Sequence, residues 1–234
     1  MLFLLLFPYL ALAQTTVDVE KDNAVPKRDG QYFTVSDAIF SPYKYVAVVA
    51  GTPFFSENWM KGIVVFGSGR KTTSRYLKLD LLSGEVVYKD SLGRELVATN
   101  PISGLLLTDS ITGKDYIFRN SQVSPFSSKA SGIGWYQELE TGTAVLYKKI
   151  NKSILETRPF NSATFERTIN TKNLYFIDIA NDLSPFKTLK DITNILSDKR
   201  EQLREFITTN NFKDKTEAIF IEVVAKYNLL ATSQ

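Results

Sequence analysis

The side chains of this chain that could do chemistry are its carboxylates, because its 234 residues include no histidine and no cysteine. Histidine is the commonest general base, and cysteine is a common nucleophile. Glycan hydrolysis needs neither, since two carboxylates can do the work. The spacing of the glutamates on or beside expected strands brings no pair together across a cleft, so the sequence indicates no catalytic residue. A carboxylate-dependent glycan hydrolase therefore stands only as an alternative. These glutamates are Glu85, Glu95, Glu138 and Glu156.

Patterns that bind a cofactor, a metal or nucleic acid are also missing from the sequence. The glycine-rich segment 67–71 lacks the spacing of a phosphate-binding loop. Asp178, Asn181 and Asp182 offer oxygen ligands to calcium, but this pattern is more typical of a turn. The net charge of +3 is too small to indicate nucleic acid. We therefore expect no cofactor, no metal site and no nucleic-acid partner.

Basic side chains are concentrated in residues 144–172, where six bases accompany two acids. We interpret them as the solvated side of a hairpin. The alternative is a surface for an acidic glycan or a lipid head group. The bases are Lys148, Lys149, Lys152, Arg158, Arg167 and Lys172.

An antiparallel sheet is expected to position these residues. Residues 61–120 form short alternating segments separated by turn residues, which predicts a β-meander. Leu77 and Leu79 fall on one side of the clearest segment and Tyr76 and Lys78 on the other, the period of two that a half-buried strand requires. We expect an antiparallel β domain over residues 32–187, built as a strongly curved sheet or a partial barrel.

Residues 188–234 change to a helical period. Ile192, Ile195 and Leu196 begin an apolar stripe on one helical face. Asp214 and Glu217 have capping-box spacing at the start of a final helix. The sequence therefore predicts an α+β fold with two to three C-terminal helices packed on the sheet.

The beginning of the chain is typical of an exported protein. Residues 2–12 are largely apolar and end in an A-x-A pattern at Ala11 and Ala13 before Gln14, which predicts a signal peptide over residues 1–13. A flexible segment is expected over residues 14–31. The apolar run is shorter than the roughly 20 residues that cross a bilayer, so we expect no transmembrane segment in the mature chain. The expected location is the periplasm or the outer cell envelope.

One combination of features gives a resemblance to a protein family. It consists of Gly51-Thr52-Pro53-Phe54 before Trp59 and Gly62, the turns of segment 77–95, Gly134-Trp135-Tyr136 before Leu146-Tyr147-Lys148-Lys149, and Asp198-Lys199 through Phe206-Ile207 to Tyr227-Asn228. Over residues 40–230 the chain thereby resembles secreted envelope proteins of unknown function of the Bacteroidetes type. The resemblance implies a β-meander followed by C-terminal helices and no established activity.

The function that we predict from these features is binding rather than catalysis. The partner would be an unknown envelope protein or an apolar ligand. A leader, a curved sheet and covering helices are similar to those of periplasmic lipid carriers, so a lipid carrier is a further alternative. Trp135 and Tyr136 would line the cavity of a carrier. The competing interpretation places both side chains in the core.

Two short segments resemble the Asp-Ser/Thr-apolar acceptor of periplasmic O-glycosylation in the same group of bacteria. They are Asp90-Ser91-Leu92 and Asp109-Ser110-Ile111, both in expected hairpin turns. Turns also favour Asp and Ser for their own hydrogen bonds. Ser91 and Ser110 are therefore candidate modification sites.

A mass measurement tests both expectations for processing. We expect intact-mass spectrometry of the protein from its native envelope to give a chain beginning at Gln14, with added glycan mass on Ser91 or Ser110. An unmodified mass at both serines would contradict the acceptor assignment. A retained leader would contradict the predicted cleavage.

Overall fold

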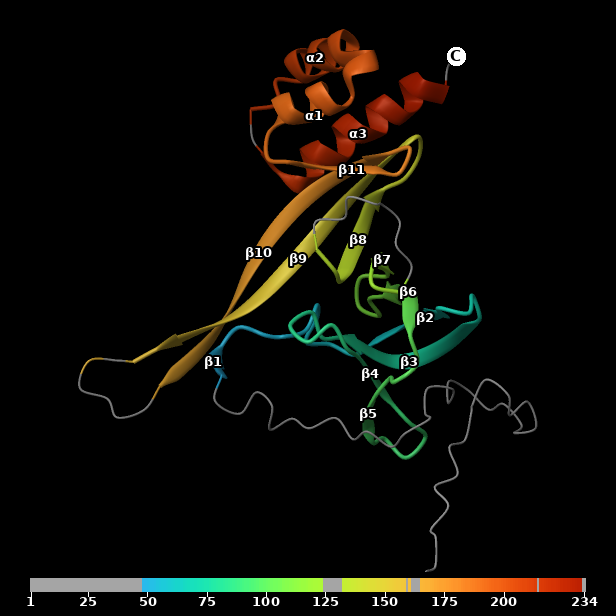
Figure 1. The fold of residues 1–234 in the computed structure, drawn as a ribbon, viewed down its shortest axis with the longest axis vertical. Helices are drawn as coiled ribbons and strands as arrows, with labels where there is room; N and C mark the ends of the chain where they lie inside the picture. Colours follow the sequence, from blue (N-terminus) through green and yellow to red (C-terminus); the bar gives the residue numbers. More distant parts are fainter. Residues whose placement is uncertain (1–47, 124–131, 159, 161–164, 214, 233–234) are drawn as a thin grey trace, which may run out of the picture.

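A computed structural model describes residues 48–123, 132–158, 160, 165–213 and 215–232 (Figure 1). They form an α+β protein in which one curved, open sheet is followed by three α-helices. The fold class expected from the sequence is confirmed. The expected signal peptide with Ala11, Ala13 and Gln14, and the expected flexible segment, lie outside the described residues.

The sheet contains eleven strands. They are β1 (Val48–Ala50), β2 (Met60–Phe66), β3 (Lys71–Leu79), β4 (Val86–Lys89), β5 (Glu95–Val97), β6 (Ile102–Thr108), β7 (Asp115–Asn120), β8 (Trp135–Glu140), β9 (Ala144–Thr157), β10 (Glu166–Ile179) and β11 (Asp182–Phe186). The helices are α1 (Leu189–Ile195), α2 (Arg200–Thr209) and α3 (Glu217–Thr232), with a 3-10 turn at Ser197–Lys199 between the first two.

The strands follow the order β1-β10-β9-β8-β7-β6-β2-β3-β4-β5, and β11 pairs with β10. The strand pairs are antiparallel except β1 with β10. The meander expected over residues 61–120 is interrupted once, because β6 returns to pair with β2 instead of β5. The three residues of β5 offer a short ladder, whereas β2 offers β6 a partner of equal length.

The turn between β10 and β11 explains the Asp178, Asn181 and Asp182 pattern. Ile179 pairs with Asp182, and the two residues between them have positive φ angles, 53° at Ala180 and 65° at Asn181. Two successive residues with positive φ are typical of a type I′ hairpin turn. These residues therefore build a turn, as the sequence indicates.

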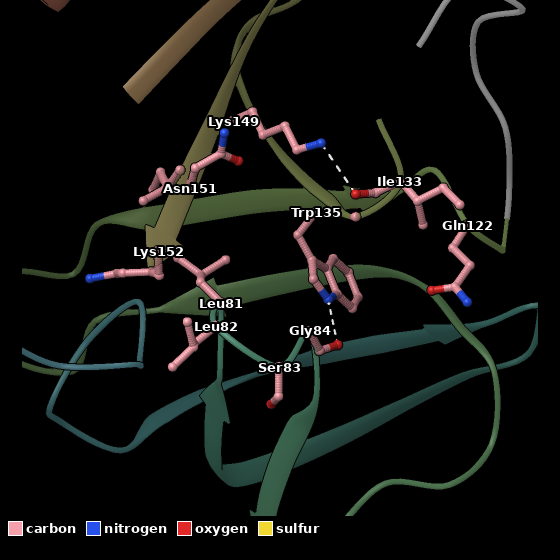
Figure 2. Close-up of a pocket in the computed structure, with 12 residues that line it drawn as sticks. Leu81, Leu82, Ser83, Gly84, Gln122, Ile133, Trp135, Lys149, Asn151 and Lys152 are labelled. Atoms are coloured by element: carbon pink, nitrogen blue, oxygen red, sulfur yellow. Dashed lines mark hydrogen bonds between the residues drawn. The ribbon is translucent and has the colours of Figure 1, made fainter. Parts of the chain in front are cut away.

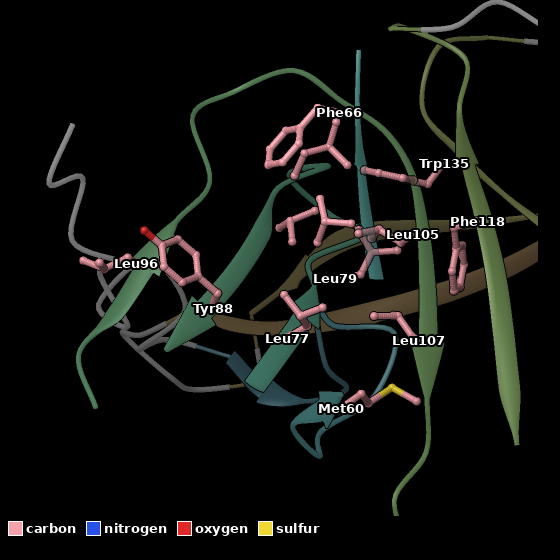
Figure 3. Close-up of a cluster of buried hydrophobic side chains, with 13 residues drawn as sticks. Met60, Phe66, Leu77, Leu79, Tyr88, Leu96, Leu105, Leu107, Phe118 and Trp135 are labelled. Atoms are coloured by element: carbon pink, nitrogen blue, oxygen red, sulfur yellow. The ribbon is translucent and has the colours of Figure 1, made fainter. Parts of the chain in front are cut away.

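The first hydrophobic core lies within the curve of β2 to β8 (Figure 3). Leu77 and Leu79 are buried in it, while Tyr76, the residue before Leu77, is exposed, which confirms the expected alternation. Strands β3 to β5 and strands β6 and β7 all contribute side chains to this core. Its packing therefore holds the first group of strands against the second. Its best-buried members are Val64, Phe66, Leu77, Leu79, Tyr88, Leu107 and Phe118.

The second core lies between the C-terminal helices and one face of β8 to β11. Ile192 and Leu196 are fully buried there, as the helical stripe predicts. Thr188 caps α1 in a capping box with Asp191. Glu217 at the start of α3 contacts the sheet: its Oε2 accepts a hydrogen bond from the Tyr175 hydroxyl at 3.0 Å and lies 2.7 Å from Lys148 Nζ. Asp214, its expected capping partner, lies outside the described residues.

The buried side chain of Asn228 joins α3 to the beginning of β9. Its Oδ1 accepts the N–H of Ala144 at 2.8 Å, and its Nδ2 donates to the carbonyl of Ala144 at 3.0 Å. The carboxamide approaches the preceding turn so closely that a Cβ on Gly142 would lie 2.4 Å from Asn228 Cγ. This position therefore requires glycine, and α3 has one fixed register against β9.

We predict that Asn228→Leu destabilises the protein strongly. Two buried backbone groups of Ala144 would lose their partner, at about 1–3 kcal/mol each, so the free energy of unfolding should fall by about 2–6 kcal/mol. Denaturant titration measures this change, with the exposed Asn58→Ala as control. Equal stability of the two variants would show that the Asn228 bridge does not hold the helices.

Candidate ligand pocket

A pocket of about 290 Å³ opens between the turn after β3 and the middle of β9 (Figure 2). Residues 81–84 form one wall, residues 133–135 at the start of β8 form the second, and residues 149–152 of β9 form the third. Gln122 completes the lining. Segments that are far apart in the sequence therefore meet at one site.

A buried aspartate builds the turn that forms the first wall. Asp80 Oδ1 accepts hydrogen bonds from the backbone N–H groups of Leu82 and Ser83 at 2.9 and 3.0 Å. The backbone carbonyl of Asp80 accepts a hydrogen bond from the N–H of Gly84 at 2.8 Å. The carbonyl of Gly84 in turn accepts the indole N–H of Trp135 at 2.9 Å. Figure 2 shows this bond holding the Trp135 ring between the turn and β9.

Lys149 brings a buried ammonium group to the pocket. The residue is only 9% exposed. Its Nζ donates to the carbonyl of Ile133 at 3.2 Å and lies 3.5 Å from the Tyr136 hydroxyl and 4.9 Å from the centre of the Tyr136 ring. Burial lowers the pKa of Lys149. An anion beside this group would favour its charged form.

The charge of the pocket lining is positive, because it includes two lysines and no acidic residue. The second lysine is Lys152, whose pKa is lowered by burial while the Glu57 carboxylate acts in the opposite direction. Its ammonium points away from Trp135 in Figure 2. Ser83, Gln122 and Asn151 add polar groups. The lining therefore suits a small anion with an apolar part.

Charged and polar side chains from four adjacent strands lie on the same face of the sheet as Lys149. Arg119 of β7 pairs with Glu138 of β8, whose carboxylate also accepts a hydrogen bond of 3.3 Å from Tyr147 of β9. Burial and the nearby Glu138 raise the pKa of Tyr147. Asp178 of β10 is 8% exposed, and its Oδ1 has no hydrogen-bond partner among the described residues. Burial, the largest effect on this group, raises the pKa of Asp178.

A second hollow, of about 400 Å³, lies over β2, β6 and β7. Val65, Leu106 and Ile117 give it an apolar floor, and Lys71 and Arg119 add positive charge. Arg119 is already paired with Glu138. We therefore take the pocket at Lys149 as the candidate site.

The structure places the four glutamates of the hydrolase alternative at separate positions, and none lines the pocket. Glu85 accepts a hydrogen bond from Ser83, and Glu95 lies 3.6 Å from Lys89. Glu138 pairs with Arg119, and Glu156 with Arg167.

The two aromatic residues singled out from the sequence have different positions. Tyr136 is fully buried and packs edge-on against Tyr147 and Phe176, which confirms the core interpretation for this ring. Trp135 belongs to the first core and also lines the pocket.

Ser91 and Ser110 both lie exposed in hairpin turns. Asp90 and Asp109 stabilise these turns by accepting backbone N–H groups from Leu92 and Ile111, at 2.9 and 2.8 Å. The hydrogen-bonding role of the two aspartates is thus present, and modification of the serines stays a prediction.

The solvated-hairpin interpretation is wrong for Lys149, because this residue is buried. Lys148 also contacts Glu217 instead of lying free in water. The period of two along β9 places Lys149 on the same side as the aromatic Tyr147, a signal of burial. Nothing in the spacing along the chain indicates that the turn at residues 81–84 faces Lys149.

No protein-family model matches the chain, and neither a curated protein nor a solved structure matches it. Among the described residues, no helix has the length and apolar character needed to cross a membrane. The same residues include no group of three or more acidic, histidine or cysteine side chains placed to hold a metal ion.

We predict that Asp178→Asn stabilises the protein at neutral pH. A raised pKa means that the folded state binds the proton more tightly than the unfolded state, so ionisation costs stability above the raised pKa and nothing below the ordinary value of 3.8. The variant removes this cost and keeps an oxygen for the N–H of Asn181. Thermal denaturation should show a melting temperature higher by about 2–4 °C at pH 7, as expected for about 1 kcal/mol.

The gain in melting temperature should vanish at pH 3, where residue 178 is neutral in both the parent and the Asp178→Asn variant. The exposed Glu205→Gln is the control for removing one acidic charge. A melting temperature for Asp178→Asn equal to or below that of the parent at pH 7 would contradict the prediction.

Proposed function

We propose that the protein is an exported, non-enzymatic binding protein of the bacterial cell envelope, in the periplasm or the outer envelope, and that it binds a small organic anion in the pocket at Lys149. The observation that carries this proposal is a pocket lining with two lysines, an anchored tryptophan and no acidic residue. The resemblance to secreted envelope proteins supports the same location.

The geometry suggests how such a ligand would bind. A carboxylate would approach the ammonium group of Lys149, where burial strengthens the attraction between opposite charges. An apolar part would pack against Trp135 and Leu81. The volume lies near the lower end of the range of about 300–1,000 Å³ for small-molecule sites, which favours a compact ligand.

Binding is better supported than hydrolysis, because the glutamates of the hydrolase alternative lie apart and away from the pocket. It is also better supported than lipid transport at this site, because the lining combines apolar walls with two lysines and three other polar side chains. A long acyl chain would match only part of this lining.

We predict that Lys149→Met weakens anion binding at least about tenfold, since a charge-assisted hydrogen bond contributes about 1.5–3 kcal/mol. The chain has two tryptophans, so a Trp59→Phe background leaves Trp135 as the only indole. Its fluorescence reports titrations with benzoate, hexanoate and inorganic phosphate. Benzoate should give the largest saturable change, because it joins a carboxylate to an apolar ring.

Lys71→Met is the matched control, because Lys71 is an exposed lysine outside this pocket. Affinity should also fall as the pH rises through the lowered pKa of Lys149, because only the ammonium form attracts the anion. The proposal fails if none of the three probes saturates, or if Lys149→Met and Lys71→Met bind benzoate equally well.

A further inference from the structure

Strand β9 extends well beyond the strand beside it. It has fourteen residues, but β8 pairs only with Leu146, Tyr147 and Lys148. Past Lys148, the outer edge of β9 has no strand partner among the described residues. Figure 1 shows β9 and β10 leaving the sheet together as a long arm. The arm therefore presents an open edge of backbone N–H and C=O groups, which is a template for strand pairing.

The other edge of the arm is occupied near both of its ends. Strand β10 pairs with β9 over its whole length, with β11 near the helices, and with β1 at Arg167 and Thr168. Apolar side chains near the open edge are exposed: Ile154 to 44% and Leu155 to 48%. An incoming strand would thus gain both backbone hydrogen bonds and apolar contact on β9.

The residues of the open edge are complementary to themselves when two copies run antiparallel. If Ile154 lies opposite Ile154 of a second copy, Lys152 lies opposite Glu156 of that copy, and the pair occurs twice by symmetry. Opposite charges directly across two strands stabilise their pairing. All three side chains share one face, because they alternate along the strand.

The charges around this pairing alternate in sign. Glu57 lies close enough to Lys152 to affect its pKa, and Arg167 pairs with Glu156 across the arm at 2.6 Å. Lys152 of one copy would therefore enter between its own Glu57 and Glu156 of the second copy. A shift of two residues would instead bring Lys152 opposite Arg158 or opposite Ile154, which loses the charge match.

We propose that two copies of this chain associate through the outer edges of β9, with Ile154 at the two-fold axis, and so form one continuous sheet. This interface shares Lys152 with the lining of the anion pocket, but the dimer proposal is argued from the open edge of β9 and not from anion binding.

Charge reversal tests the register. Sedimentation equilibrium of the full chain should show a dimer. Lys152→Glu and Glu156→Lys should each raise the dimer dissociation constant at least about tenfold, because each places like charges together twice. The double variant should return close to the parent value, since it restores both pairs. Glu166→Lys and Lys172→Glu are matched controls, because they make the same charge changes on β10 and should leave the dissociation constant unchanged.

Cross-linking gives an independent readout in a chain without cysteine. Ile154→Cys should form a disulfide-linked dimer on mild oxidation, because facing residues of antiparallel strands lie about 4.5–5.5 Å apart at Cα, within the range of a disulfide. Leu155→Cys has similar exposure but should not cross-link, since Ser153 of the second copy would face it. A monomer at all concentrations overturns the proposal. A dimer whose dissociation constant is unchanged by Lys152→Glu and by Glu156→Lys also overturns it, as does equal cross-linking of Ile154→Cys and Leu155→Cys.

Discussion

The contact between the Asn228 carboxamide and both backbone groups of Ala144 is the constraint on which the arrangement of helices and sheet depends. It acts where β9 begins, and it uses a donor and an acceptor that strand pairing leaves available. The carboxamide fits only above a glycine at residue 142, and glycine is the residue that the sequence has there. The apolar stripe of α3 then has one position over Leu146 and Ile177.

Strand β9 relates the three regions of the protein to one another. Its first residues lie under the helices, Lys149 lies in the pocket, and its last residues belong to the open arm. The buried ammonium group at its middle is held by neutral partners, the carbonyl of Ile133 and the hydroxyl of Tyr136. The pocket thus combines a rigid strand with a turn that Asp80 fixes.

Much of the architecture could be predicted from the sequence, because local patterns determine it. The alternation at Leu77 and Leu79 and the helical spacing of Ile192 and Leu196 give the elements and their buried faces. The return of β6 to β2 could not be predicted, because several antiparallel orders satisfy the same alternation. The pocket could not be predicted either, since Gly84 meets Trp135 only after the sheet has curved.

The parallel pairing of β1 with β10 has a consequence for the order in which a nascent chain can fold. Val48 pairs with Arg167, so this edge strand emerges from the ribosome long before the strand that completes it. Contacts between such distant parts of a chain form late and slow the whole process. Until β10 has been synthesised, β1 has no strand partner among the described residues, so a strand made early must wait for one made late.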